Sequence, residues 1–262
     1  MQDGNFSVDG LRRLNGAGIT RFAADVVAKV VSRDTAASVA LKEPLLAAVM
    51  DSARASGPGG LDRLMADFRR ARVSQEVLAD HYIPEVARRL GRAWEEDAAS
   101  FADVSIGSAR LQAFLNEIGR SWAADGTEGA AGSTVLLVVP GGEQHTLGAR
   151  VAAGWMRRKG ISVCLRIAPT TAELAAILAQ RRFDGAMISV ACHEKLETCT
   201  GLVKTLRGET SDGLRIALGG AILGRGEDIA TVSGVDIVTN DLPKAVEALG
   251  LTCKRPLVTV LT

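Results

Sequence analysis

The second half of this chain alternates apolar, strand-like runs with amphipathic, helix-like segments, and this alternation constrains the fold more than any other feature. Short runs rich in Val, Ile and Leu predict strands at residues 134–139, 161–167, 185–190, 215–218 and 237–239. Amphipathic segments predict helices at residues 148–158, 171–181, 196–206, 222–232 and 242–249. Because each parallel strand pair needs a crossover connection, the pattern predicts an α/β domain with a parallel five-stranded sheet and helices on both faces.

The first half has the 3.6-residue periodicity of helices, which predicts an N-terminal helical bundle. Glu43 and Pro44 suit the first turn of a helix that the Gly/Pro-rich stretch 56–60 ends, and Ser74 and Pro84 mark two further starts. A long helix is predicted over residues 101–122. The apolar stripes consist of Phe22, Val26, Val27 and Val30, then Leu61, Leu64, Met65 and Phe68, then Val86, Leu90 and Trp94, and finally Val104, Ile106, Leu111, Leu115 and Ile118.

Small and polar residues interrupt both patterns over residues 125–133, so this stretch is the predicted linker. It separates a helical domain, residues 1–125, from an α/β domain, residues 133–262. The chain lacks an apolar run of membrane-spanning length, and the start of the sequence lacks the order of a signal peptide, so a cytoplasmic protein is expected. The chain has 31 Lys and Arg residues and 30 Asp and Glu residues. This balance argues against an overall electrostatic attraction of the protein to nucleic acid or to an anionic membrane.

The four cysteines form no C-x-x-C pair, so they are interpreted as reduced thiols, most of them filling the core. They are Cys164, Cys192, Cys199 and Cys253.

Unusual residues gather in the loops that follow three of the predicted strands. Glu143, His145 and Gly148 follow the first strand. The third strand ends near Ser189 and Ala191, and Gly219 and Gly220 follow the fourth. Because the carboxyl ends of parallel strands share one edge of a sheet, these loops are expected to face one crevice. Taken alone, a loop histidine beside a glutamate is more often part of a surface ion pair than a ligand, and two glycines alone indicate only a turn.

The spacing of these residues resembles that of a known cofactor-binding domain. It reads E-x-H-x-x-G, 40 residues, S-x-A, 27 residues, G-G. This is similar to the pattern D-x-H-x-x-G, S-x-L, G-G of the cobalamin-binding domain in methionine synthase, the mutases and light-sensing regulators. The resemblance implies a Rossmann-like (flavodoxin-like) fold that binds cobalamin after the vitamin's own base has left the cobalt.

The resemblance also implies a role for each matching residue. His145 would be the cobalt ligand, and Glu143 would orient its ring in place of the family's aspartate, with a bond that the extra methylene loosens or redirects. Ser189 would hydrogen-bond the displaced base. Small residues would make room for the corrin and for the base, and the neighbouring motif residues would complete the site. These residues are Gly148, Ala191, Gly219 and Gly220, together with Gln144, Thr146, Leu147 and, beside the nucleotide tail, His193.

Residues 82–115 resemble the helical cap that covers the upper face of the corrin in relatives. Trp94 matches the cap tryptophan, placed either over the corrin or in the helical core, but Val104 and Ser105 stand where photoreceptor relatives have Glu-His. The sequence therefore leaves the upper ligand of cobalt unassigned. His81 is one candidate, with a plain surface histidine as the alternative. Among hydroxo-, methyl- and adenosylcobalamin, the missing cap histidine favours small upper groups.

Over its whole length the chain is most similar to the AerR and PpaA antirepressors of photosynthesis gene control, which have a helical part before a "GEQHTLG"-type domain. The resemblance implies a light-responsive transcription regulator that binds a PpsR- or CrtJ-type repressor. Two alternatives stay open, a corrinoid shuttle protein of a methyltransferase system and a haem-binding redox sensor of the same fold.

An enzyme is not expected, because no nucleophile–base pair has supporting context. The acidic run Glu95, Glu96 and Asp97 is interpreted as a solvated helix end. The basic runs at residues 69–72 and at Arg88 and Arg89 could form a local basic patch that contacts DNA. No helix-turn-helix or other DNA-recognition motif accompanies them. DNA contact is therefore expected only weakly or through the repressor.

Overall fold

The computed structural model describes residues 40–55, 59–124, 132–143, 145–191, 193–210, 213–225, 229 and 233–253. The predicted stripe of Phe22 to Val30 and most of the predicted linker lie outside these residues. The helical part comprises α2 (Glu43–Arg54), α3 (Gly60–Arg70), α4 (Gln75–Val77), the π-helical turn η1 (Leu78–Tyr82), α5 (Ile83–Glu95) and α6 (Phe101–Ala124). None of the described helices is both long and apolar enough to span a bilayer.

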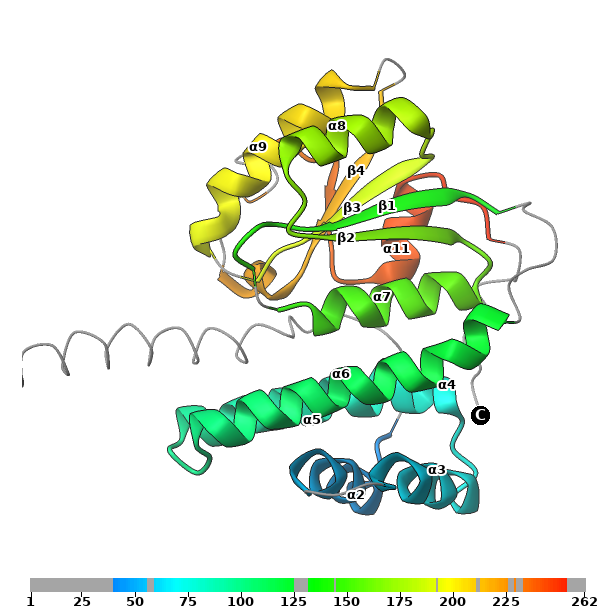
Figure 1. The fold of residues 1–262 in the computed structure, drawn as a ribbon, viewed down its shortest axis with the longest axis vertical. Helices are drawn as coiled ribbons and strands as arrows, with labels where there is room; N and C mark the ends of the chain where they lie inside the picture. The colour runs from blue at the N-terminus through cyan, green and yellow to red at the C-terminus, as the bar shows by residue number, and fades with distance from the viewer. Residues whose placement is uncertain are drawn as a thin grey trace, which may run out of the picture.

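The helical part is layered, with α2 and α3 on the outside and the antiparallel pair α5 and α6 between them and the sheet (Figure 1). Its core is built from the apolar stripes that the sequence predicts. Tyr82 and Phe68 are fully buried and meet edge to face, with ring centroids 4.9 Å apart. Ile106 is the exception to the predicted stripe, because its side chain is 49% exposed while Val104 and Leu111 are buried.

The predicted helix start at Pro84 is confirmed, since α5 begins at Ile83 with Pro84 in its first turn, although no loop separates α5 from the turn before it. Ser74 caps α4, since its Oγ accepts a hydrogen bond from the Val77 amide at 3.4 Å. The chain then continues through the π turn η1 directly into α5, where Pro84 occupies the first turn. Proline has no amide hydrogen to give to the preceding turn, and the wider turn accommodates this loss without ending the helix.

The second half forms a parallel sheet in the order β2-β1-β3-β4-β5, which confirms the predicted fold class. Its strands are β1 (Thr134–Val139), β2 (Ser162–Ile167), β3 (Gly185–Ser189), β4 (Ile216–Gly219) and β5 (Ile237–Val238). Its helices are α7 (Leu147–Arg158), α8 (Thr171–Gln180), the 3₁₀ turn η2 (His193–Lys195), α9 (Leu196–Gly208), the 3₁₀ turn η3 (Ala221–Arg225) and α11 (Leu242–Ala248).

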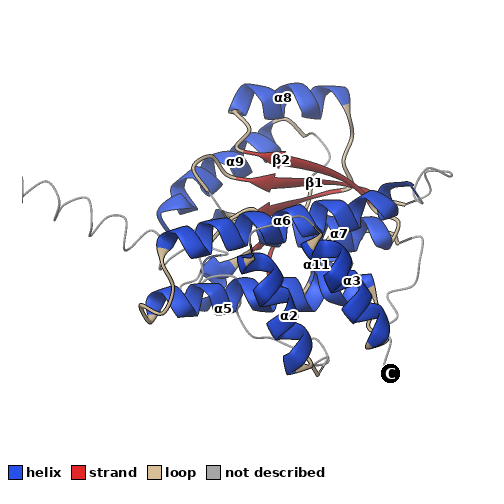
Figure 2. Ribbon diagram, turned by 60° about the horizontal axis from the view of Figure 1, so that its bottom comes forward, coloured by secondary structure: helices blue, strands red, loops and turns tan. Residues whose placement is uncertain are grey.

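Helices cover both faces of the sheet (Figures 1 and 2), and alternate strand residues pack against them. Leu136 and Val138 of β1 belong to the core under α8 and α9, whereas Leu137 and Val139 belong to the core over α7 and α11. This period of two is the pattern of a sheet covered on both sides.

The prediction of an α-helix over residues 222–232 is wrong at its start. Residues Ala221–Arg225 form the 3₁₀ turn η3, and most of the remainder lies outside the described residues. The turn follows Gly220, whose φ of 118° lies outside the helical region. A chain leaving such a residue closes more readily into a tight turn than into a regular helix, and glycine at 224 does not favour extension.

Helix α7 belongs to two cores at once. Ala149, Ala153 and Met156 pack against the sheet, while Leu147 and Val151 pack into the core of the helical part. The helical part and the sheet are therefore joined through the two faces of α7. The proposed division at residues 125–133 stays a prediction, since residues 125–131 lie outside the described part of the chain.

An ion pair adds to the contact between the helical part and α7, which we call the seam. Arg158, at the end of α7, donates from Nη2 to both carboxylate oxygens of Asp80 in η1, with Oδ2 at 2.6 Å. The two side chains are only 11% and 17% exposed. A pair so little exposed to water costs more to break than a surface pair.

Replacing Asp80 with asparagine is expected to lower the free energy of unfolding by about 2 kcal/mol, because Arg158 keeps a partner of the right shape but loses the opposing charge. Urea unfolding measures the change. The matched control is Glu117→Gln, which removes the charge from an exposed pair with Arg120 and is expected to cost less than about 0.5 kcal/mol. Equal losses in the two variants would show that the seam does not depend on the buried pair.

Candidate functional site

The three loops that the sequence singles out meet at the carboxyl edge of the sheet. The strand order reverses direction between β1 and β3, and in open α/β sheets ligands bind in the crevice at such a switch point. In both views this edge lies on the same side of the molecule as the turn between α5 and α6 (Figures 1 and 2). The edge at which the three loops meet is therefore the candidate site.

Glu143 and His145 form a buried pair at the switch point. The ring Nδ1 of His145 lies within hydrogen-bond reach of Glu143 Oε1, and the His145 amide donates to the same oxygen at 3.0 Å. The other carboxylate oxygen, Oε2, accepts from the amide of Ala191 at 2.8 Å. Glu143 thereby links the loop after β1 to the loop after β3 and fixes the imidazole between them.

The side chain of His145 is 8% exposed and that of Glu143 is 0% exposed, so the pair is not the surface ion pair considered as the alternative. The extra methylene of Glu143 was expected to loosen or redirect its bond to the histidine, and the structure shows the bond in place. The longer side chain reaches both the ring and the Ala191 amide. A carboxylate that holds Nδ1 leaves Nε2 as the nitrogen through which such a ring can bind a metal.

Electrostatics keep Glu143 ionised. Burial acts to raise the pKa of this carboxyl group, but the hydrogen bond from the His145 ring, its charge and the two backbone amides outweigh burial and lower the pKa to about 2. An ionised carboxylate accepts hydrogen bonds only, so it selects the imidazole form that carries a proton on Nδ1.

Replacing Glu143 with glutamine is expected to lower the free energy of unfolding by about 2 kcal/mol at neutral pH, because charge-assisted hydrogen bonds become neutral ones. The pKa falls from 4.5 to about 2 on folding, so the carboxylate's contribution is complete above its unfolded pKa and is lost as the pH falls through the folded one. The difference between the wild type and the variant, measured by urea unfolding, should shrink across this window. A constant difference would contradict the assignment.

The two glycines after β4 are required by the fold itself. A Cβ on Gly220 would lie 2.1 Å from the carbonyl oxygen of Val190, and one on Gly219 would lie 2.9 Å from that of Thr239. Gly220 is also gripped by an amide side chain, since Asn240 Oδ1 accepts from its amide at 2.6 Å and Asn240 Nδ2 donates to its carbonyl at 3.1 Å. These contacts pull the ends of β3, β4 and β5 together around the candidate site.

Gly148 differs from these glycines. It is exposed in the first turn of α7, and a Cβ there would meet no atom of the chain within 4 Å. No contact among the described residues requires a glycine at this position. Space left at the edge of a site is what a closely approaching ligand needs.

The other predicted residues fall into three groups. Ser189 and Thr146 are half-buried beside the candidate site, and Ala191 is buried there. Leu147 is not a lining residue, because its side chain packs into the core of the helical part. Gln144 and the side chain of His193 lie outside the described part of the structure.

The two residues considered for the upper side of the site, His81 and Trp94, lie in different parts of the helical region. His81 lies in η1, next to Asp80, which binds Arg158 at the C-terminal end of α7. His145 comes just before the N-terminal end of the same helix. A 12-residue helix is about 18 Å long, so His81 is too remote to be the upper ligand. Nor is it a plain surface histidine, since burial lowers its pKa. Trp94 is half-buried at the end of α5 that faces the candidate site, and its role stays a prediction.

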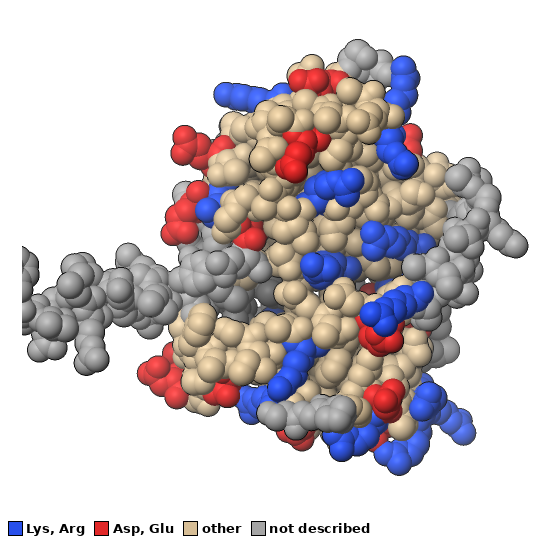
Figure 3. Space-filling view, in the orientation of Figure 1, with Lys and Arg blue, Asp and Glu red and all other residues tan. Residues whose placement is uncertain are grey.

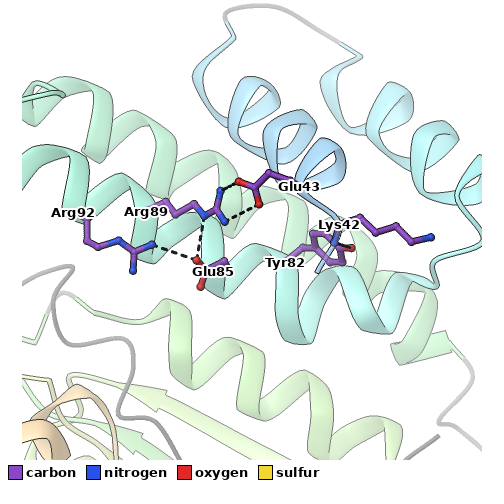
Figure 4. A network of polar contacts seen from close by, with 6 residues as sticks. All are labelled: Lys42, Glu43, Tyr82, Glu85, Arg89 and Arg92. Atoms are coloured by element: carbon purple, nitrogen blue, oxygen red, sulfur yellow. Dashed lines mark hydrogen bonds and ion pairs between the residues drawn. The ribbon is translucent and has the colours of Figure 1, made fainter. Parts of the chain in front are cut away.

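Several charges of the two basic runs are balanced by neighbouring carboxylates, and their contact with DNA stays a prediction. Arg89 binds Glu43 and Glu85, with Nη2 to Glu43 Oε2 at 3.0 Å and Nε to Glu85 Oε1 at 3.1 Å (Figure 4). Arg88 and Arg92 also pair with Glu85. In the other run, Arg70 pairs with Asp67. Neighbouring carboxylates thus oppose several of these charges.

Two further expectations can be compared with the described residues. Glu95, Glu96 and Asp97 are exposed, which confirms the solvated helix end. Cys164, Cys199 and Cys253 are free thiols, and burial raises the pKa of Cys199 to about 12, as expected for a core residue. Among the described residues there is no cluster of three His, Cys, Asp or Glu side chains that could hold a metal ion.

Sequence comparison places the chain among known proteins. It is 44% identical, over 191 residues, to the uncharacterized 20.5 kDa protein in the bchF-crtJ intergenic region of Rhodobacter capsulatus, covering 73% of this chain and 100% of the relative. The chain belongs to the family of that Rhodobacter protein. No protein-family model matches the chain.

Among solved structures, this chain shares its fold with a corrinoid protein. The monomethylamine corrinoid protein of Methanosarcina barkeri matches with a TM-score of 0.62 at 15% identity, covering 79% of this chain and 96% of the other. A cobalamin-binding protein from Desulfitobacterium hafniense matches less well, with a TM-score of 0.40 at 14% identity. The first match confirms the fold, with N-terminal helices followed by a parallel sheet.

Proposed function

We propose that this protein binds cobalamin at the carboxyl edge of its sheet, with His145 as the protein ligand of cobalt. The observation that carries the proposal is the buried imidazole whose Nδ1 is held by an ionised carboxylate. Metal-binding histidines commonly have this arrangement, because the carboxylate fixes the tautomer and raises the basicity of Nε2. The corrinoid-protein fold and the spacing of the sequence motif support the choice of cobalamin over haem.

The residues around His145 fit a large planar ligand. Gly148 leaves open space in the first turn of α7, and Ser189 offers a hydroxyl near the ends of β3 and β4. Glu143 would position the imidazole ring of His145 without itself contacting the ligand. Gly219 and Gly220 would act indirectly, by holding the ends of three strands close together.

We further propose that the protein is a light-responsive regulator that acts on a PpsR- or CrtJ-type repressor. The gene of the Rhodobacter relative lies beside crtJ, and such a repressor is the partner that the sequence resemblance implies. Bound cobalamin would supply a cobalt–ligand bond that visible light breaks. The protein's contribution would be to transmit a change at His145 to a surface that the repressor contacts.

Helix α7 is the element suited to this transmission. It begins two residues after His145, and its other face packs into the helical core through Leu147 and Val151. A shift of the loop after β1 would therefore alter the seam with the helical part. Coupling of about 1–3 kcal/mol would change repressor affinity by roughly 5- to 150-fold.

The test is the affinity of the cobalamin-loaded protein for the repressor in the dark and after illumination. We expect a difference of at least about fivefold in the wild type and none in His145→Ala. Equal affinities in both states would disprove light regulation. Loading with haem and assaying methyl transfer to a thiol separate the alternatives, because a Soret band that depends on His145, or catalytic methyl transfer, would replace this proposal with a haem sensor or a corrinoid shuttle.

A further inference from the structure

A second cavity lies away from the candidate cofactor site, along the seam between α6 and α7. It has a volume of about 240 Å³. Its walls come from α6, from the face of α7 turned toward the helical part, and from η1 and β2. Four of its lining residues are arginines, Arg120, Arg150, Arg157 and Arg158. Basic side chains are visible along this seam in the space-filling view (Figure 3).

The positive charge of this cleft is only partly balanced. Arg158 is paired with Asp80, and Arg120 with Glu117. Arg150 and Arg157 form no ion pair with a described carboxylate. Their guanidinium groups donate to neutral oxygens instead, Arg150 Nη1 to Asn116 Oδ1 at 3.5 Å and Arg157 Nη2 to the Val163 carbonyl at 3.1 Å.

Arg150 carries a second indication. Its Nε is buried and has no hydrogen-bond partner among the described residues. A buried donor without an acceptor is unfavourable, and such atoms commonly mark the place of a ligand or an ordered water. The cleft also has room beside this group, since a Cβ on Gly119 of α6 would meet no atom within 4 Å.

We propose that this cleft binds a phosphate group. Guanidinium forks match the oxygens of phosphate and carboxylate, but two helices presenting arginines from opposite walls favour an anion with more than two oxygens. The bound anion would bridge Arg120 of α6 with Arg150 and Arg157 of α7. It would thereby hold the helical part against the sheet, independently of any ligand at His145.

The experiment is calorimetric titration of the full-length protein with inorganic phosphate and with pyrophosphate, at ionic strength held constant with sodium chloride. We expect saturable binding by the wild type and binding at least tenfold weaker by Arg150→Gln. The matched control is Arg181→Gln, an exposed arginine after α8 on the opposite face of the sheet, which is expected to bind like the wild type.

Arg157→Gln serves as a second variant, because Arg157 is exposed and its replacement removes a single hydrogen bond to the backbone. It is expected to weaken binding as well. The proposal is overturned if the wild type shows no saturable binding, or if Arg150→Gln and Arg157→Gln both bind phosphate like the wild type. Acetate binding as tight as phosphate binding would reassign the cleft to carboxylates.

Discussion

Replacement of His145 by alanine is expected to weaken the binding of hydroxocobalamin by more than the roughly 100-fold that loss of the hydrogen-bond partner of a metal-binding histidine can cost. The variant loses the buried imidazole whose Nδ1 is held by Glu143. The absorption bands of any corrinoid that remains bound should shift as well. Titration followed by visible absorption measures both effects.

The matched control for this variant is His81→Gln, which changes a half-buried histidine at the other end of α7 and should leave affinity and spectrum unchanged. Glu143→Gln should give an intermediate loss of about 10- to 100-fold, because the ligand remains but its orientation is no longer fixed. If His145→Ala bound cobalamin like the wild type, the assignment of this residue as the ligand would be wrong.

Replacement of Gly220 by alanine is expected to lower the free energy of unfolding by about 4 kcal/mol or more, since backbone strain and overpacking each contribute about 1–3 kcal/mol. The new methyl group would overlap the carbonyl of Val190, at a φ of 118° that other residues avoid. Neither neighbour can move freely, because Val190 donates to the Gly219 carbonyl and Asn240 holds Gly220 from the other side. Urea unfolding measures the loss.

Gly148→Ala is the control for this effect. Its methyl group meets no atom, so the variant should be as stable as the wild type, or more stable by about 0.5–1 kcal/mol through helix propensity. It should nevertheless bind cobalamin more weakly if the ligand passes close to this turn. We interpret Gly220 as a glycine that the fold requires and Gly148 as a glycine that the ligand requires. Similar stability losses in the two variants would contradict this interpretation.

The sheet could be predicted from the sequence because its signals are local. Strands such as β1 are continuous apolar runs between breakers, and the first three crossover helices carry regular periodicity. The loop residues could be assigned to one edge because parallel topology places the carboxyl ends of all strands there. The Glu143–His145 pairing follows from a spacing of two residues in one loop.

Other features depend on contacts between distant segments and left no local signal. The π turn before Pro84 is stabilised by buried Tyr82 and Leu78, which are ordinary helix residues in the sequence. The grip of Asn240 on Gly220 joins residues 20 positions apart. The second face of α7 also left no local signal, because Arg150 and Val151 contact residues of the helical part that are far away in the sequence.

The most direct test of the cobalt ligand is electron paramagnetic resonance of the protein in the Co(II) state, after growth with ¹⁵N-histidine and loading with unlabelled cobalamin. The chain has three histidines, so the variant combining His81→Gln with His193→Gln leaves His145 as the only labelled ring. A nitrogen bound to cobalt splits the signal into triplets when it is ¹⁴N and into doublets when it is ¹⁵N. We expect doublets from the labelled variant. Triplets would mean that the vitamin's own base stays on the metal, and would contradict the assignment of His145.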